Sequence, residues 1–321
     1  MFLVIGYNNE IAIRHFIKVL TLKKLDHSFD FLDLADLEKA VDIDITFEND
    51  LLIKIGDKTF DFSCYNSIYS RCLYQAPLDK SNILKVVNFI FLLQNYLEFS
   101  DKVVVNRPGA GNSNYTKLYH IKKLKDFGFK TPDTYIFGSA PSAQKVVEAD
   151  GNWISKGTSS IRTKAVELDE ALYEDLHLVN RIPSLFQQHI RGFDVRLHLV
   201  GSKPLALKIE SPNVDYRYNT SGNIYSEITI PTDILKSCID FCTEDGLLFA
   251  GIDFKVTETG QWVILEVNNT PGYNFFDTKM DYAISLALFD FLNQTGPGSG
   301  AFGDQPVSHK TFIAPERRTM S

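Results

Sequence analysis

Three oxygen-bearing side chains stand at the two ends of one predicted hairpin, and they raise the first functional question. The stretch GIDFKVTETGQWVILEVN, residues 251–268, alternates apolar and polar residues on either side of the turn sequence TETG. Asp253 lies near the start of the first strand, whereas Glu266 and Asn268 lie at the end of the second. Antiparallel pairing around the turn therefore brings these three side chains together.

The chemistry of this trio favours a divalent metal ion. Glu266 lies inside the apolar run 262–267, and a carboxylate buried in a strand is costly unless it has a strong partner. Two carboxylates and a carboxamide suit Mg²⁺, a hard cation that completes its shell with phosphate oxygens. An ordinary polar strand end is the alternative interpretation, and the three residues alone do not decide between the two.

The elements that must position the trio begin with a small α/β domain, predicted over residues 1–105. FLVIG is a short buried strand, and EIAIRHFIKVLTLKKL has helical spacing. FDFLDL, LLIKIG and KTFDF are short strands separated by Asp, Asn and Gly, and residues 81–99 are an apolar helix that we expect to be buried. The Pro/Gly/Asn-rich loop within residues 103–117 then marks a domain boundary.

Two further subdomains are predicted, a central one over 106–185 and a C-terminal one over 186–294. In the first, the helix TKLYHIKKLKDFG ends at Gly128, and the strands TPDTYIF and NWISKG flank another helix. In the second, the strands SLFQQHI, DVRLHLVG, PLALKIE and NIYSEITI precede a helix over 232–244. The hairpin with the metal trio follows, and the helix DYAISLALFDFLNQ closes the folded part.

Composition excludes several classes of function. The chain has 321 residues, 44% of them apolar, and a net charge of −7 without a long basic block, which argues against nucleic acid as a main partner. No apolar run approaches the roughly eighteen residues of a membrane span, and MFLVIGYNNE lacks the basic start of a signal peptide. Four cysteines are sparse; Cys238 and Cys242 fit reduced thiols in a helix, as expected in the cytoplasm.

The segment 295–321 differs from the rest of the chain. It begins with TGPGSG, which has flexible-linker chemistry, and continues without hydrophobic periodicity, so we predict disorder. It is a native tail, the remnant of an engineered junction, or a peptide tethered through an engineered linker, and we favour the last. A tethered substrate would react through Glu316 or the Ser321 terminus.

Five segments, in this order, resemble the ATP-grasp superfamily. They are NYTKLYHIKKLKDFGFKTPDTYIF, NWISK, FQQHIRGFDVRLHLVG, VDYRYN and GIDFKV…ILEVNNTPG. Each is a weak motif alone, but together they are specific and cover roughly residues 100–290, with a weaker likeness in the N-terminal domain. The resemblance implies an α/β and α+β architecture, the ATP-grasp fold with an N-terminal α/β pre-ATP-grasp domain. It also implies that Asp253, Glu266 and Asn268 hold Mg²⁺ on ATP.

The resemblance assigns several residues to the nucleotide. Lys117 on the entry helix and Lys156 in NWISK would neutralise phosphate oxygens as point charges. Gln187 would contact the adenine edge, together with the backbone groups of Gln188 and Ile190. These five positions match the family's motifs by their order along the chain.

The residues expected at the reacting end follow the same resemblance. Asp194 corresponds to the acceptor for the ribose hydroxyls. Arg196 and Arg217 would grip the γ-phosphate and a developing acyl-phosphate, where planar bidentate donors suit oxyanions. Asn219 would position substrate or phosphate.

A few polar features keep a structural or open role. His189 and His198 are interpreted as structural histidines rather than as catalytic bases, and Arg71 either contacts substrate or braces the N-terminal domain. The loop GTSSIRTK (157–164) stands where the family has a glycine-rich lid, but it has only one glycine. The loop therefore departs from the family's pattern for closure over the phosphates.

The predicted function is an ATP-dependent carboxylate–amine or carboxylate–alcohol ligase that modifies a ribosomal peptide through an acyl-phosphate. Two peptide-modifying branches are similar: the glutamate ligase that tails a ribosomal protein, and the maturases of microviridin-type graspetides. A small amino-acid ligase and a non-catalytic ATP-binding regulator are the alternatives. The sequence does not identify the peptide. It also leaves open whether an ester or an amide forms, whether a ring closes or an amino acid is added, and whether the chain is a homodimer.

Overall fold

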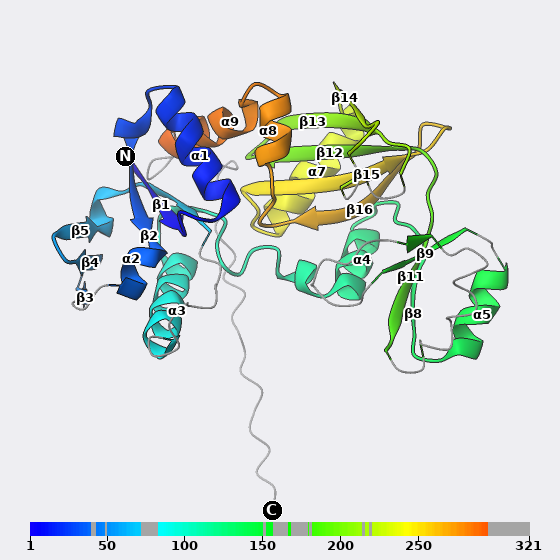
Figure 1. Cartoon of the computed structure of the whole chain (residues 1–321), viewed down its shortest axis with the longest axis horizontal. Coiled ribbons are helices and arrows are strands. Elements are labelled where there is room, and N and C mark those ends of the chain that lie inside the picture. Colours follow the sequence, from blue (N-terminus) through cyan, green and yellow to red (C-terminus); the bar gives the residue numbers. More distant parts are fainter. Residues whose placement is uncertain are drawn as a thin grey trace, which may run out of the picture.

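The computed structural model describes most of the chain, and Figure 1 shows how its elements are arranged. The described residues are 1–39, 43–48, 50–71, 83–149, 152–156, 166–167, 179, 182–213, 216–217 and 220–294. Their strands form four sheets, which lie in an N-terminal region, a central subdomain and a C-terminal subdomain. Within these residues, no helix combines the length and apolarity needed to cross a membrane.

The N-terminal region contains a parallel sheet and a small antiparallel one. The parallel sheet has the order β2-β1-β6-β7, and the antiparallel sheet has the order β3-β4-β5. These elements confirm the α/β alternation that the sequence predicts. The strands and helices are β1 (Phe2–Gly6), α1 (Ile11–Leu22), η1 (Asp26–Ser28), β2 (Phe29–Asp33), α2 (Leu34–Lys39), β3 (Ile43–Phe47), β4 (Leu51–Ile55), β5 (Lys58–Asp61), η2 (Phe62–Cys64), β6 (Ser67–Ser70), α3 (Ile83–Phe99) and β7 (Val103–Val105).

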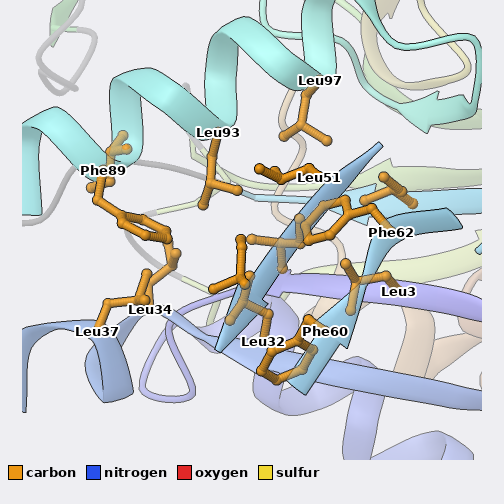
Figure 2. Close-up of a cluster of buried hydrophobic side chains, with 14 of the residues drawn as sticks. Leu3, Leu32, Leu34, Leu37, Leu51, Phe60, Phe62, Phe89, Leu93 and Leu97 are labelled. Atoms are coloured by element: carbon orange, nitrogen blue, oxygen red, sulfur yellow. The ribbon is translucent and has the colours of Figure 1, made fainter. Parts of the chain in front are cut away.

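Helix α3 buries only one of its faces. Figure 2 shows Phe89, Leu93 and Leu97 of that face packed against apolar side chains from the strands and from α2. The opposite face leaves Phe91 59% and Phe99 76% exposed. The prediction of a buried helix is therefore wrong for half of α3, because apolar composition does not show which faces have a packing partner.

The central subdomain carries an antiparallel sheet of order β10-β9-β11-β8. Helix α4 ends as predicted: Gly128 takes a left-handed backbone conformation (φ +104°) just beyond its last turn. Strand β11 spans the predicted boundary between 185 and 186. The elements are η4 (Asn112–Tyr115), α4 (Lys117–Asp126), β8 (Thr134–Phe137), α5 (Ala140–Ala149), β9 (Trp153–Lys156), β10 (Val166–Glu167) and β11 (Ser184–Gln188).

The C-terminal subdomain is built on an antiparallel sheet of order β14-β13-β12-β15-β16. Its helix α7 packs on the sheet through Phe241 and the free thiols of Cys238 and Cys242. The last helix packs back onto the N-terminal sheet, where Leu288 shares a core with Phe2. The elements are β12 (Phe193–Val200), β13 (Lys203–Glu210), β14 (Ile224–Glu227), α7 (Thr232–Glu244), β15 (Phe249–Val256), β16 (Trp262–Asn268), α8 (Asn274–Lys279) and α9 (Ala283–Gln294).

Candidate active site

The predicted hairpin places the oxygen-bearing trio on neighbouring positions of β15 and β16. Asp253 pairs with Glu266, and Gly251 pairs with Asn268. The register shifts just beyond Asp253, so that Leu265 is an extra residue on β16, an irregularity of the kind found next to active sites. All three side chains of the trio line one cavity of about 520 Å³, and their convergence is therefore confirmed.

Hydrogen bonds already connect two members of the trio. Arg196 Nη1 donates to Asp253 Oδ2 at 2.7 Å, and Asn268 Nδ2 donates to the same oxygen at 3.3 Å. Asn268 Oδ1 accepts from Asn114 Nδ2 at 3.4 Å. In the described part of the chain, no three His, Cys, Asp or Glu side chains form a metal cluster, and the trio adds the amide oxygen of Asn268 to its two carboxylates. Two carboxylates and an amide facing one cavity are a donor set that fits Mg²⁺.

Cationic side chains line the same cavity. Lys117 at the start of α4, Arg196 on β12 and Arg217 all contribute to its wall. Burial lowers the pKa of the Lys117 ammonium, the Glu266 carboxylate opposes that shift, and the Arg217 guanidinium adds to it. Burial also opposes the charge on Arg196, but the Asp253 carboxylate raises the pKa of that group, which stays charged. The cavity therefore combines a metal donor set with cations suited to phosphate oxygens.

His120 locks helix α4 to strand β16. The backbone N–H of Val267 donates to His120 Nε2 at 3.0 Å, and His120 Nδ1 lies 2.9 Å from Ser113 Oγ. Burial lowers the pKa of His120 to about 4, so the ring is neutral near pH 7 and its Nε2 is a hydrogen-bond acceptor. Lys117 lies one helical turn before His120 and lines the same cavity as Glu266, so this bond helps to hold Lys117 within the electrostatic influence of Glu266.

A second, smaller cavity of about 110 Å³ adjoins the first. Gln187, Gln188, Ile190 and Asp194, the residues predicted at the adenine and the ribose, all line it. Gln187 Nε2 donates to Thr134 Oγ1 at 3.0 Å. The N–H of Gln188 donates to a backbone carbonyl of the same subdomain at 2.8 Å, so that group is occupied within the protein. The proposed nucleotide residues are thus brought together, but not every polar atom among them is available to a ligand.

Several predicted residues lie elsewhere or outside the described structure. Lys156 ends β9, but its side chain is not among the described ones, and Asn219 and the loop 157–164 also lie outside the described residues. Arg71 braces the fold: it donates to Glu10 Oε1 at 2.8 Å and to the backbone oxygen of Pro271 at 3.2 Å. It thereby ties the N-terminal region to the loop that follows the metal trio.

Sequence reasoning missed some residues of the two cavities. Tyr216 lines both, and burial followed by the Asp253 carboxylate raises the pKa of its phenol. Lys255 Nζ donates to Asp194 Oδ2 at 2.8 Å. Lys255 follows Asp253 by two residues, so strand alternation already placed both on one face of β15. No sequence pattern predicted that Phe275 and Phe276 form an aromatic wall of the larger cavity, because both lie on the short helix α8.

Comparison with known proteins gives remote relatives. No protein-family model matches the chain. The β-citrylglutamate synthase B of Danio rerio is 27% identical over 203 residues, which are 59% of this chain and 50% of that protein. A probable α-L-glutamate ligase of Methanococcoides burtonii is 25% identical over 164 residues, which are 50% of this chain and 52% of that protein. The chain spans about half the length of these curated relatives.

Solved structures share the fold over nearly the whole chain. A Chryseobacterium gregarium RiPP-associated ATP-grasp ligase, in complex with ADP and a leader and core peptide, has a TM-score of 0.77 at 16% identity, covering 92% of this chain and 97% of that one. The macrocyclase MdnC of Microcystis aeruginosa, bound with the precursor peptide MdnA, has a TM-score of 0.74 at 16% identity, covering 91% and 99%. The D-alanyl-alanine synthetase A of Vibrio cholerae has a TM-score of 0.56 at 12% identity, covering 92% and 97%. At these identities the likeness shows the fold.

Proposed function

We propose that this chain, which has the ATP-grasp fold, is an ATP-dependent ligase that joins a carboxylate to an amine or a hydroxyl group of a peptide. The observation that carries the proposal is one cavity in which Asp253, Glu266 and Asn268 lie with Lys117 and Arg217. The solved structure of the ATP-grasp ligase PsnB, complexed with a minimal precursor, Mg and ADP, covers 91% of this chain at 20% identity and supports the same substrate class.

In the proposed mechanism, the smaller cavity binds the base and ribose, and the larger one binds the phosphates and the acceptor. Lys117, Arg196 and Arg217 would hold phosphate oxygens, with Lys156 as a further candidate. Asp253, Glu266 and Asn268 would hold Mg²⁺. The bound metal supplies positive charge that neutralises phosphate oxygens and aligns them for in-line transfer. This division of labour needs no side chain that bonds covalently to substrate.

Two chemical steps follow from this arrangement. An oxygen of the substrate carboxylate attacks the γ-phosphorus, the bond to the bridging oxygen breaks, and ADP leaves. An amine or hydroxyl group then attacks the acyl carbon, inorganic phosphate leaves, and a proton is released. Arg196 and Arg217 would stabilise the charge on the acyl-phosphate. His120 Nε2 and His198 Nε2 both have hydrogen-bond partners within the protein, so neither is proposed as the base.

The aromatic lining of the larger cavity favours a peptide over a free amino acid. The cavity of about 520 Å³ must also hold the phosphates, and beyond the charged residues Tyr225, Phe275 and Phe276 form one wall. Aromatic rings at that position suit a flanking apolar side chain. The curated relatives favour the second candidate, a ligase for small acidic amino acids, over about half of the chain. A reducing cytoplasm remains the proposed compartment.

The test combines phosphate release with mass spectrometry. The full chain is incubated with Mg-ATP and a pool of acidic peptides, and separately with free glutamate and a carboxylate acceptor. Loss of one water mass from a peptide, with ADP formation, supports an internal ring-closing ligase, whereas a gain of one residue mass supports a tailing ligase. Turnover of free amino acids alone supports the small-substrate alternative. ATP binding without turnover in all mixtures overturns the ligase proposal and favours the regulator.

A further inference from the structure

The guanidinium of Arg196 is held from several sides although it lies inside the candidate active site. The residue is only 7% exposed. Its Nη1 donates to Asp253 Oδ2 at 2.7 Å, and its Nε donates to His198 Nε2 at 3.3 Å. The ring of Phe276 lies 5.6 Å from the guanidinium carbon, within cation–π range. Each contact comes from a different residue, so together they fix both the position and the plane of the group.

Gly251 leaves the space that this guanidinium occupies. A Cβ atom built on Gly251 would lie 2.3 Å from Arg196 Nη2, closer than any van der Waals contact allows. The same atom would lie 2.7 Å from a side-chain carbon of Pro271. The strand opposite Arg196 therefore carries no side chain at a position where one would displace the guanidinium.

His198 is a polar side chain in an otherwise apolar part of β12. It is 1% exposed, and the rings of Phe249 and Phe276 lie 6.3 Å and 5.3 Å from its own. Burial lowers its pKa well below the usual range, the Arg196 charge lowers it further, and a hydrogen bond with the backbone of Gly272 opposes this. The ring is thus neutral, with Nε2 as an acceptor for the Nε–H of Arg196.

A purely structural histidine explains these contacts less well. An apolar residue at position 198 would fill the space beside Phe249 and Phe276 without the penalty of burying an imidazole. What an apolar residue cannot do is accept a hydrogen bond from Arg196 while bonding the backbone of Gly272; a purely structural histidine would need only the second of these bonds. The interaction also uses the one nitrogen of the guanidinium that lies nearest its stem, so it restricts rotation of the whole group.

We propose that His198 is a positioning residue that orients the Arg196 guanidinium towards Asp253 and the phosphate-binding part of the cavity. The hydrogen bond between Arg196 and His198 is observed in the structure, whereas its effect on the rate of turnover rests on the proposed ligase function. With Nε held by His198, the two terminal nitrogens keep a fixed direction when anionic groups enter. Sequence reasoning placed His198 among structural histidines, and this inference assigns it a role in shaping the site.

Nuclear magnetic resonance of the full chain labelled with ¹⁵N-arginine tests the contact without any substrate. The Nε–H signal of Arg196 is identified by its absence in Arg196→Lys. We expect slow solvent exchange of this proton in the wild type and in His198→Gln, which keeps an acceptor. In His198→Phe, and in His198→Leu if the Phe variant does not fold, exchange becomes about tenfold faster or more. Equal exchange in all variants overturns the proposal.

Kinetics separate positioning from a general effect on folding. In His198→Phe, kcat for ADP formation should fall about tenfold with little change in the KM for ATP, and His198→Gln should recover most of the loss. In an Arg196→Ala background, His198→Phe should add no further loss. Additive losses would assign His198 a structural role only. If the wild type turns over no peptide, the ligase proposal fails. The solvent-exchange experiment still shows whether His198 accepts a hydrogen bond from Arg196. The exposed His27→Gln is the matched control.

Discussion

The two sheets that border the candidate site present their polar groups in different ways. On the five-stranded sheet, buried charges are paired across strands: Arg196 with Asp253, and Lys255 with Asp194. On the four-stranded sheet β10-β9-β11-β8, the described polar side chains that line the cavities are neutral: Gln187, which is bonded to Thr134, and Gln188. Lys156 ends β9 of this sheet, but its side chain is not among the described ones. We infer from these described side chains that the first sheet contributes charge and the second contributes shape and neutral hydrogen bonding.

The physical consequence is a difference in tolerance to mutation. Removing one member of a buried ion pair leaves the other charge uncompensated, which typically costs about 3–5 kcal/mol. Removing one partner of a neutral hydrogen bond costs about 1–3 kcal/mol when the other partner stays buried and unpaired. Substitutions on the five-stranded sheet should therefore have larger effects than substitutions on the four-stranded sheet β10-β9-β11-β8.

The largest effect is expected at the oxygen-bearing trio. Glu266→Gln keeps the shape but removes a carboxylate, and metal charge stabilisation is worth several kcal/mol, so turnover should fall about a thousandfold or more. Phosphate release over a Mg²⁺ titration measures it. The control is Glu258→Gln, which changes an exposed carboxylate at the turn of the same hairpin. Turnover of Glu266→Gln within tenfold of the wild type would contradict the metal site.

The next effect concerns the bond that locks α4 to the five-stranded sheet. Burial, with Lys123 adding and Asp245 opposing, lowers the pKa of His120 to about 4 in the folded state. In the unfolded chain the His120 ring has a pKa of about 6.5, so as the pH falls the unfolded state takes up the proton before the folded state does. Above about pH 6.5, protonation of His120 does not reduce the free energy of unfolding. As the pH falls from there towards about 4, the free energy of unfolding decreases, by about 3 kcal/mol in total.

Urea unfolding at a series of pH values measures this dependence. His120→Gln keeps a hydrogen-bond acceptor but does not titrate, so its stability should fall less steeply between about pH 6.5 and 4. Other groups, His198 among them, contribute equally to both proteins, and the difference between the two curves isolates His120. Parallel curves would mean that the histidine does not titrate as its burial requires.

Much of this fold could be predicted from the sequence, because local patterns report local structure. The alternation in residues 251–268 gave both strands and the meeting of their ends, and the helix predicted over 232–244 matches α7. The ATP-grasp fold expected from the order of five motifs is confirmed by the solved structures. Helix α8 was missed, because six residues are too few for an amphipathic period to appear.

The candidate site was less accessible to sequence reasoning, since its supporting contacts are distant in the chain. The bond between His120 and the backbone of Val267 joins residues 147 positions apart, and no local pattern announces it. The pairing of Arg196 with Asp253 depends on strand order, which alternation does not give. Sequence motifs identified which residues carry chemistry, whereas the partners that orient them needed the three-dimensional structure.

A third, smaller effect should follow from filling the space beside Arg196. In Gly251→Ala, the added Cβ would lie 2.3 Å from Arg196 Nη2, so the guanidinium must move by a distance that can cost about a hundredfold in rate. The control is Gly138→Ala on the four-stranded side, where the nearest atom to an added Cβ is 3.8 Å away. Steady-state ADP formation compares them, and similar rates for the two variants would remove the distinction between the sheets.

The smallest effect is expected on the four-stranded sheet itself. Gln187→Ala removes a neutral hydrogen bond to Thr134, worth about 1 kcal/mol, so the affinity for Mg-ADP should weaken about fivefold. Thr134→Val removes the same bond without altering the cavity wall, and calorimetry of both variants separates orientation of Gln187 from direct contact with the nucleotide. Equal weakening means that Thr134 acts by orienting Gln187. A loss from Gln187→Ala as large as that from Glu266→Gln would break the comparison, because a neutral side chain would then matter as much as a buried charge.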